Sequence, residues 1–286
     1  MGKLGIFLCN LPHYTLIFLS MNEINNNEIK SILFDLSKKF ILPMYNNLRE
    51  DDLMRKDNND LVTSVDLCVE DELNNILCKL LPNSLFVGEE KFSKSPRIIN
   101  NYNKKEYCWT VDPIDGTDNF AKGKEKFAVM IALSFGEQIL QSWIYKPLTE
   151  EMCSAIQGEG TFLNEKKILI EKTTSLNLSK GSISSKYWDD NYSKRILEIK
   201  NSFGEVKSYG CIGFEYIDIA NSTRQFAILS KLSPWDHLPG ILIIREANGF
   251  DTYFDYGIYN HCLNKKNLIV ACNGRLGKKI LTLIKE

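Results

Sequence analysis

The apolar residues near the start of the chain recur at helical spacing in two stretches. In the first, between Asn22 and Asn47, they fall three or four positions apart, as on one face of an amphipathic helix: Ile29, Ile32, Leu33, Leu36 and Phe40. The second stretch shows similar spacing at Val69, Leu73, Ile76, Leu77 and Leu80. Thr63 or Ser64 precedes it and is a suitable N-cap, because a hydroxyl accepts a hydrogen bond from the N–H groups of a first turn. We therefore predict two amphipathic helices.

Short apolar segments in the middle of the chain predict strands. They are Leu85–Val87, Tyr107–Val111, Phe127–Phe135, Ile139–Tyr145 and Glu151–Gln157. The turn Gly136-Glu137-Gln138 joins the third and fourth segments, which indicates a hairpin. The following segment, GEGTFLNEK from Gly158, continues an antiparallel sheet. GEGTF is similar to a glycine-rich phosphate loop, but it lacks P-loop spacing and precedes no helix, so we interpret it as a turn.

From about Leu176, strands and helices interleave, which is typical of an α/β arrangement. The predicted strands are Gly181–Ser185, Val206–Tyr209 and Leu268–Ala271. The predicted helices are Asp190–Phe203, a helix that has Asp236 as its N-cap and runs through Ile241 to Ala247, and Leu276–Ile284. We predict an α+β half over residues 21–175 and an α/β half over residues 176–286. Between the strands of the first half, Ser93–Lys105 is polar and has no periodicity, which predicts a mobile loop.

The first twenty residues are apolar but match neither a signal peptide nor a membrane span. Pro12, His13 and Tyr14 interrupt the apolar run, no small-residue cleavage site follows, and the run is too short to cross a bilayer. We predict that translation starts at Met21 and that residues 1–20 are a non-native or disordered extension. No other stretch is apolar enough to span a membrane, so we expect no membrane association.

Composition and charge restrict the function without naming it. Of the 286 residues, 44% are hydrophobic and 25% are charged, as in globular proteins. The 35 basic and 36 acidic side chains give a net charge of −1, so no overall charge attracts nucleic acid, and any affinity for phosphate is local. The eight cysteines are irregularly spaced, which predicts reduced packing residues in a cytoplasmic protein.

An acidic cluster follows one predicted strand, in the stretch WTVDPIDGTDNF that begins at Trp109. Its carboxylates belong to Asp112, Asp115 and Asp118. Carboxylate oxygens are ligands for Mg²⁺, Gly116 lets the backbone approach an anion, and Thr117 at a helix start offers N–H groups. The same residue types also form an ordinary turn, in which Pro fixes φ and Gly supplies a positive φ. On this stretch alone both interpretations stay open.

Two distant acidic stretches favour the metal and phosphate interpretation. Gly88-Glu89-Glu90 follows a predicted strand, and Trp235-Asp236-His237 precedes a predicted helix. In order from about Asp60, the motifs GEE, DPIDGTDNF and WDHLPG resemble the metal site of the inositol monophosphatase superfamily of Mg²⁺-dependent phosphatases. The resemblance implies a layered αβαβα sandwich with the metals between two halves, and commonly a homodimer.

The resemblance also implies residue roles. It implies that a first Mg²⁺ is bound by Glu89, Asp112, the Ile114 carbonyl and Thr117, and a second by Asp112, Asp115 and Asp236, with two or three ions in all. Asp66, in a D-x-V-T-x-x-D segment, would orient the attacking water with Thr117. Without the family, Asp66 is only a favourable charge in a first helical turn. The N–H groups of Gly116 and Thr117 would bind phosphoryl oxygens.

Three neighbouring residues allow plainer interpretations. Capping of the helix through Ile241–Ala247, with Pro239 in its first turn, would by itself explain Asp236. Glu90 is expected to be solvated or to support Glu89. His237 lacks a set of other histidines nearby, so we expect it to support the site rather than to bind a metal.

Two positions, Leu229 and Asp118, depart from the inositol-specific members. Seven residues before Asp236, where those members carry a glutamate that contacts inositol hydroxyls, this chain has Leu229, which accepts no hydrogen bond. Glu215 either faces the substrate instead or is a solvated helix acid. Asp118 stands where many members have a non-acidic residue. We therefore expect phosphatase chemistry without a preference for inositol phosphate.

The predicted function is Mg²⁺-dependent hydrolysis of a small-molecule phosphate monoester. Candidate substrates are inositol phosphates, nucleotide 3′-phosphates, sugar phosphates and histidinol phosphate. One alternative is a catalytically idle family member that binds a protein or RNA partner, although the complete ligand set and the balanced charge argue against it. A structural metal-binding module is a third possibility, but the matched carboxylates exceed what one structural cation needs.

Overall fold

The structure of the chain is a computed structural model that describes residues 24–56, 60–173 and 175–286. The predicted extension over residues 1–20 and the predicted start at Met21 lie outside the described residues. Within the described ranges, no helix is both long enough and apolar enough to cross a membrane. Seven of the cysteines lie in these ranges, and all seven are free thiols.

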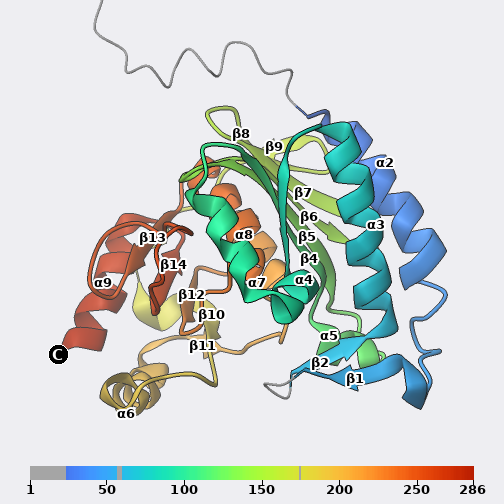
Figure 1. Cartoon of the computed structure of the whole chain (residues 1–286). Helices are drawn as coiled ribbons and strands as arrows, with labels where there is room; N and C mark the ends of the chain where they lie inside the picture. The colour runs from blue at the N-terminus through green and yellow to red at the C-terminus, as the bar shows by residue number, and fades with distance from the viewer. Residues whose placement is uncertain (1–23, 57–59, 174) are drawn as a thin grey trace, which may run out of the picture.

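A seven-stranded sheet is the larger of the two main sheets (Figure 1). In spatial order its strands are β3 (Leu85–Gly88), β4 (Tyr107–Asp115), β5 (Ala128–Phe135), β6 (Gln138–Lys146), β7 (Glu151–Ile156), β8 (Gly160–Leu163) and β9 (Lys166–Ile168). β3 is parallel to β4, and each later pair of neighbours is antiparallel. The predicted hairpin is confirmed as β5 and β6, and the GEGTF segment turns the chain from β7 into β8 as predicted.

A five-stranded sheet forms from the later part of the chain. In spatial order its strands are β11 (Glu205–Val206), β10 (Lys180–Ile183), β12 (Phe226–Leu229), β14 (Leu268–Ala271) and β13 (Phe250–Tyr253). β11 is shorter than the predicted strand Val206–Tyr209. Its end leaves the sheet because the hydroxyl of Ser208 and the backbone N–H of Tyr209 donate hydrogen bonds to Glu215.

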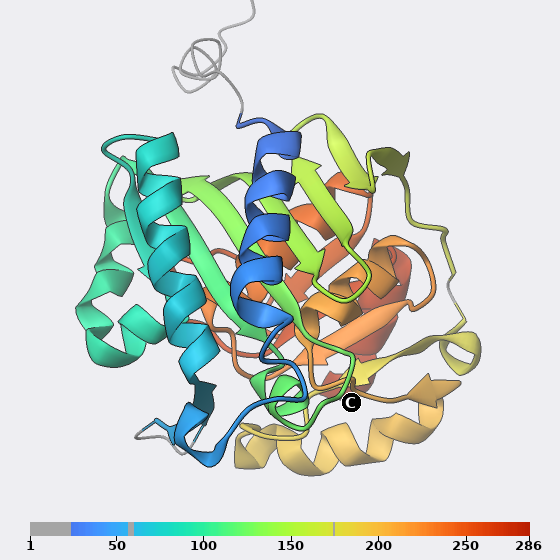
Figure 2. The same cartoon turned by 90° about the vertical axis from the view of Figure 1, so that its right-hand side faces the viewer.

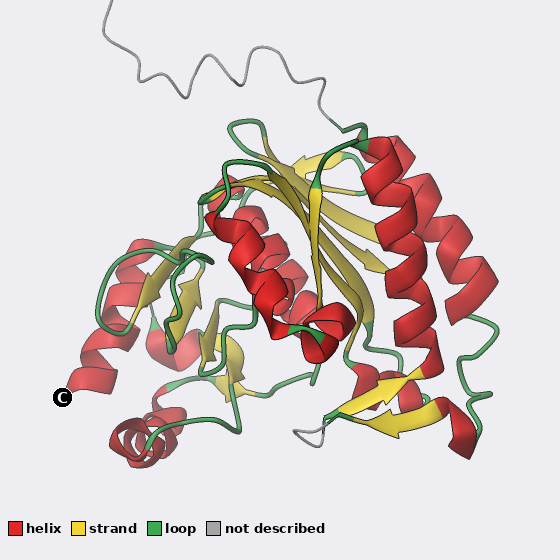
Figure 3. Cartoon of the chain, viewed as in Figure 1, coloured by secondary structure: helices red, strands yellow, loops and turns green. Residues whose placement is uncertain are grey.

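Helices cover both sheets and separate them. They are α2 (Asn26–Leu36), α3 (Ser64–Leu80), α4 (Glu89–Lys94), α5 (Thr117–Ala121), α6 (Asp190–Ile199), α7 (Ile212–Ala220), α8 (Pro234–Glu246) and α9 (Gly274–Lys285). α2 and α3 lie on one face of the larger sheet, α7 and α8 lie between the sheets, and α6 and α9 cover the far side of the smaller sheet (Figure 3). The predicted αβαβα sandwich is therefore confirmed.

A buried apolar cluster joins α2 and α3 to the larger sheet. Figure 2 shows the two helices side by side across that sheet. Leu33 of α2 and Leu73 of α3 pack in one cluster with Trp109 of β4. Their burial confirms the face that the helical spacing predicts, because apolar area removed from water is the main source of folding free energy. A second cluster, which includes Tyr216 of α7 and Ile241 of α8, fills the space between the sheets.

Some predicted boundaries and one predicted loop differ from the structure. The first helix ends at Leu36, a π-helical turn follows over Ser37–Ile41, and neither extends to Asn47. The predicted mobile loop Ser93–Lys105 is wrong. It contains the end of α4 and the 3₁₀ segment η3 (Pro96–Asn103), because Pro fits the start of a helical turn and the buried Tyr102 hydroxyl lies 2.8 Å from Thr110 Oγ1.

Smaller elements complete the described chain. β1 (Leu53–Arg55) and β2 (Leu61–Thr63) form an antiparallel pair before α3, which the sequence did not indicate. Three-residue 3₁₀ turns occur at Glu50–Asp52, Leu176–Leu178 and Lys200–Ser202. The last of these follows α6, so the predicted helix Asp190–Phe203 is two shorter elements.

Candidate metal centre

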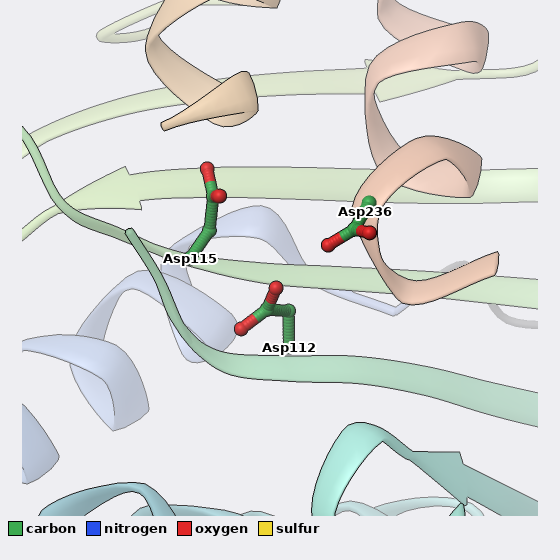
Figure 4. Close-up of side chains that lie close together, drawn as sticks. All are labelled: Asp112, Asp115 and Asp236. Carbon is green, nitrogen blue, oxygen red and sulfur yellow. The ribbon is translucent and has the colours of Figure 1, made fainter. Parts of the chain in front are cut away.

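Three carboxylates from two distant segments meet between the sheets (Figure 4). Asp112 and Asp115 come from the end of β4, and Asp236 comes from the first turn of α8. One oxygen from each of the three lies within 4.8 Å of the other two. In a regular strand, residues three apart point to opposite faces. Here an irregularity in the β4–β5 register between Asp112 and Asp115 changes that alternation, so both side chains serve one site.

The cluster concentrates negative charge where little water is present. Burial, followed by the charge of Glu89, raises the pKa of Asp112 well above its usual range. Burial and the charge of Asp236 raise the pKa of Asp115 to about 7. Asp112 Oδ1 is buried and has no hydrogen-bond partner among the described residues. Adjacent buried carboxylates with an unsatisfied oxygen are a donor set that fits a hard cation such as Mg²⁺.

The position of Asp236 in its helix differs from the predicted one. The N-cap residue of α8 is Ser233, and Pro234 is the first residue of the helix. Asp236 is therefore inside the first turn and is not the N-cap, and Pro239 lies in the body of the helix. Proline at the first position explains the early start, because its fixed φ suits a helix and its missing N–H needs no partner there.

Asp66 and Thr117 lie together beside the carboxylates. Thr117 Oγ1 is 3.1 Å from Asp66 Oδ1 and 3.0 Å from the Ile114 carbonyl oxygen. The Thr117 hydroxyl has one proton for these two acceptors. Asp66 also accepts hydrogen bonds from the backbone N–H and the hydroxyl of Thr63. The Thr63 hydroxyl oxygen in turn accepts from the Asp66 backbone N–H, which confirms Thr63 as the N-cap of α3. Burial raises the pKa of Asp66 to about 6.

Gly116 separates β4 from α5 in a conformation that favours glycine. Its φ is +87°, and a Cβ atom there would lie 2.9 Å from the Lys126 carbonyl oxygen. Glycine is therefore required for the turn itself. The turn places the backbone of Gly116 and Thr117 next to Asp115.

Glu89 is the first residue of α4 and forms an ion pair that the sequence did not indicate. Lys56 Nζ lies 2.7 Å from one carboxylate oxygen of Glu89 and 2.7 Å from one of Glu90. Burial alone lowers the pKa of Lys56, but the charges of Glu89 and Glu90 outweigh it and raise that pKa. Glu90 is buried, so the expectation that it is solvated is wrong.

Comparison with known proteins identifies the family. A model described as "Inositol monophosphatase family" matches residues 26–286. The chain belongs to the inositol monophosphatase family. Members of this family are phosphoric monoester hydrolases, and the chain is a phosphatase of this kind.

Individual relatives agree with the assignment. A "Nus factor SuhB" of Vibrio cholerae is 31% identical over 81% of this chain and 85% of its own length. A "Fructose-1,6-bisphosphatase/inositol-1-monophosphatase" of Aquifex aeolicus is 27% identical over 73% of this chain and 78% of its own length. A solved "IMPase/NADP phosphatase complexed with Mg2+ and phosphate" has the same fold, with a TM-score of 0.76 at 22% identity, covering 90% of this chain and 94% of that one.

In this member of the inositol monophosphatase family, Glu70 also helps to position the metal centre. The sequence did not indicate this role. The buried carboxylate of Glu70 accepts hydrogen bonds from the backbone N–H groups of Glu90 and Lys91, at 2.7 and 2.8 Å, and so fixes the start of α4. Gly88 leaves room for this contact, because a Cβ atom there would lie 2.3 Å from the Glu70 carboxyl group. Gly88 is the glycine of the GEE motif, and it is the feature of the sequence from which this contact could have been predicted.

The N-terminus of α7 is a second contact that was missed. Asp115 accepts hydrogen bonds from the backbone N–H of Gly213 at 2.6 Å and of Ile212 at 3.2 Å, and from the Cys211 thiol at 2.9 Å. These donors stabilise a carboxylate at a helix N-terminus. Asp115 thus joins the end of β4 to the later half of the chain.

A cavity of about 340 Å³ adjoins Asp115 and Asp236. Glu215 lines it and is buried, so the alternative of a solvated helix acid is wrong. The Glu215 carboxylate accepts hydrogen bonds from Ser182, Ser208 and the Tyr209 N–H. Leu229 lines the same cavity with an apolar side chain.

Asp118 and His237 lie outside the carboxylate cluster. Asp118 is exposed and pairs with Lys122 at 3.0 Å. The ring nitrogens of His237 lie 3.0 Å from the Tyr216 hydroxyl and 2.9 Å from the Lys231 carbonyl oxygen. Since both ring nitrogens have these partners, His237 positions the start of α8 in this structure.

Proposed function

We propose that the chain hydrolyses a small-molecule phosphate monoester with Mg²⁺ bound at the carboxylate cluster. The observation that carries this proposal is the meeting of Asp112, Asp115 and Asp236, with a buried Asp112 oxygen that has no hydrogen-bond partner in the part of the chain that the structure describes. When bound, Mg²⁺ supplies Lewis-acid polarisation of the phosphoryl group and a lowered pKa for bound water. We propose two or three ions, the first at Glu89, Asp112, the Ile114 carbonyl and Thr117, and the second at Asp112, Asp115 and Asp236.

The remaining residues of the centre act on water and phosphate. Asp66 accepts a hydrogen bond from the Thr117 hydroxyl, which leaves the lone pairs of the Thr117 oxygen available to orient an attacking water. The N–H groups of Gly116 and Thr117 bind phosphoryl oxygens as negative charge develops. No nucleophilic cysteine is needed, and the Cys211 thiol instead donates a hydrogen bond to Asp115.

The organic part of the substrate lies in the cavity that Glu215 and Leu229 line. Two serine hydroxyls and an N–H already fill much of the hydrogen-bonding capacity of Glu215, and Leu229 offers none. A substrate whose hydroxyls need many acceptors there is disfavoured. We therefore place histidinol phosphate and nucleotide 3′-phosphates, which carry fewer free hydroxyls, before inositol phosphate, and sugar phosphates remain candidates.

Phosphate release tests this function. The purified chain is assayed with a panel of inositol, sugar, nucleotide and histidinol phosphates, in Mg²⁺ and in EDTA. We expect Mg²⁺-dependent release, reduced about 10³-fold or more by Asp112→Asn, since electrostatic groups at a reaction centre have effects of this size. Asp118→Asn is the matched control, because Asp118 is exposed and pairs only with Lys122. Activity that persists in Asp112→Asn would refute the proposed centre.

A regulatory role is the second candidate, because the Vibrio cholerae relative is named a Nus factor. In that case the parent chain releases no phosphate from any member of the panel, and Asp112→Asn leaves partner binding intact. We further propose a cytoplasmic homodimer whose halves, residues 21–175 and 176–286, meet at the metal centre. Light scattering of the purified chain checks the dimer, since a monomer at micromolar concentration contradicts it.

A further inference from the structure

A second and larger cavity has Lys231 in its lining, as the substrate cavity does. Its volume is about 620 Å³, against about 340 Å³ for the first. Both cavities are lined by Tyr187, Ser230 and Lys231. The larger one lies against α4 and η3, and Glu89 is the member of the proposed metal-ligand set that lines it.

Two buried polar atoms without partners belong to residues that line this larger cavity. The hydroxyl of Tyr259 and Nδ1 of His261 form no hydrogen bond with any described residue, although Tyr259 is 4% exposed and His261 is 6% exposed. Buried polar groups in native proteins are nearly always paired, so each unpaired one needs an explanation.

The two atoms differ in what they offer. His261 Nε2 lies 2.9 Å from the Gly136 carbonyl oxygen, so this nitrogen carries the proton and Nδ1 is an acceptor. Burial lowers the pKa of His261 to about 4, which keeps the ring neutral near pH 7. The Tyr259 hydroxyl has no acceptor for its proton. The wall of the cavity therefore contains one buried donor and one buried acceptor without partners among the described residues.

Lysines give the same cavity positive charge. Lys56, Lys231, Lys265 and Lys266 line it, and so do two acids, Asp60 and Glu89. Lys231 lies 3.6 Å from Asp60, and Lys265 pairs at 2.8 Å with Asp255, which does not line the cavity. Lys266 is exposed and forms no ion pair within the described ranges. Cationic side chains of this kind favour an anionic group on a ligand.

We propose that this cavity is a second binding site, for a small organic anion that carries hydroxyl groups. Its anionic group pairs with Lys266 and Lys231, and its hydroxyls, each both donor and acceptor, satisfy Tyr259 and His261. The cavity shares Glu89 with the proposed metal-ligand set and Lys231 with the substrate cavity, but neither Asp112 nor Asp115 lines it, and binding there needs no hydrolysis. It therefore does not depend on the proposed phosphatase reaction.

Calorimetric titration of the full chain in EDTA tests the proposal, with glucose 6-phosphate, gluconate and inorganic phosphate as probes. Without a divalent cation the carboxylate cluster repels anions and no hydrolysis occurs, so only the second site is measured. We expect both hydroxylated probes to bind, and Tyr259→Phe and Lys266→Gln each to weaken binding about fivefold or more.

Two matched variants control for the removal of a hydroxyl or a charge. Tyr145→Phe deletes another buried, unpartnered hydroxyl, which belongs to the cluster under α2 and α3. Lys79→Gln deletes an exposed charge on α3. Both are expected to bind the probes as the parent does.

Three results would overturn the proposal. The first is no binding of either hydroxylated probe at about 10 mM. The second is equal binding by the parent, Tyr259→Phe and Lys266→Gln. The third is inorganic phosphate binding as tightly as glucose 6-phosphate, since hydroxyls would then contribute nothing. None of these outcomes alters phosphate release in Mg²⁺, so failure here is separable from failure of the proposed function.

Discussion

Several acids in and around the metal centre are less acidic than free side chains, and burial is the first cause for each. The pKa is raised to about 6 for Asp66, to about 7 for Glu70 and Asp115, and to about 8 for Glu90. A raised carboxyl pKa means that the folded protein keeps protons that the unfolded chain has already released. Folding is then less favourable as pH rises through that window.

The stability of the metal-free protein is expected to fall between pH 6.5 and 8.5. Glu70 and Asp115 lose their protons in this range when folded, whereas in the unfolded chain they are already ionised. Burial lowers the pKa values of His237 and His261 from 6.5 to about 4, so these two residues change the pH dependence of stability only below about pH 6.5. Chemical denaturation in EDTA should show a loss of about 1–3 kcal/mol in the free energy of unfolding.

Magnesium gives the control for this pH dependence. Since metal ligands must be ionised, Mg²⁺ should stabilise the fold more at pH 8.5 than at pH 6.5. Glu70→Gln, which removes one titrating group, should flatten the loss seen in EDTA. Stability that stays constant or rises over this range in EDTA would show that these acids are already ionised in the fold.

At the scale of elements, α4 depends on a contact between two other segments. Glu70 of α3 caps α4 through two backbone N–H groups, and Gly88 at the end of β3 leaves the space for it. A six-residue helix has little stability of its own, because helix nucleation is unfavourable. The position of Glu89 is therefore set by α3 and by Lys56, more than by α4 itself.

Gly88→Ala is expected to displace α4. Its new methyl group would lie 2.3 Å from the Glu70 carboxyl carbon, so the two groups would clash and one of them would have to move. We expect the free energy of unfolding to fall by about 1–3 kcal/mol, as for other insertions into packed interiors, and Mg²⁺ affinity to fall with it. Denaturation and Mg²⁺ titration by calorimetry measure the two effects.

Gly274→Ala is the control for this substitution. At that position the nearest atom to the new methyl group is a ring carbon of Phe250 at 3.3 Å, and the residue begins α9. Alanine there should leave stability within about 0.5 kcal/mol of the parent. If Gly88→Ala also left the free energy of unfolding and the Mg²⁺ affinity unchanged, Glu70 could not be the residue that fixes α4.

At the scale of the whole molecule, the two sheets are joined at the metal centre by polar contacts. Asp115 accepts hydrogen bonds from the start of α7, and the Asn119 side chain of α5 donates to the carbonyl oxygens of Tyr209 at 2.9 Å and Lys126 at 2.8 Å. Asp236 then completes the cluster from α8. The geometry of the site therefore depends on how the earlier and later parts of the chain dock.

Asn119→Ala is expected to weaken the contact between the earlier and later parts of the chain. It leaves two carbonyl oxygens without their donor, so we expect a loss of about 1–3 kcal/mol in the free energy of unfolding and a higher Mg²⁺ concentration for half-maximal phosphate release. Asn47→Ala is the control, because Asn47 donates only to carbonyls within four residues of itself. A normal Mg²⁺ requirement in Asn119→Ala would show that other contacts align the halves.

The sequence by itself determined what depends on neighbours along the chain. Helical spacing gave the buried faces of α2 and α3, Thr63 marked the start of α3, and the Gly136 turn marked the hairpin. The acids of DPIDG, GEE and WDH stood out because charges at the ends of apolar segments are costly without a partner. The family resemblance then supplied the sandwich that periodicity alone did not show.

Tertiary structure decided which of these acids meet and what surrounds them. Asp236 lies more than a hundred residues from Asp112, and no local pattern brings the two together. The Lys56 ion pairs, the Glu70 cap and the buried state of Glu90 and Glu215 also arise from contacts between distant segments. Hydrogen bonding and desolvation act through space, so the protonation and partners of these residues were fixed only when the chain had folded.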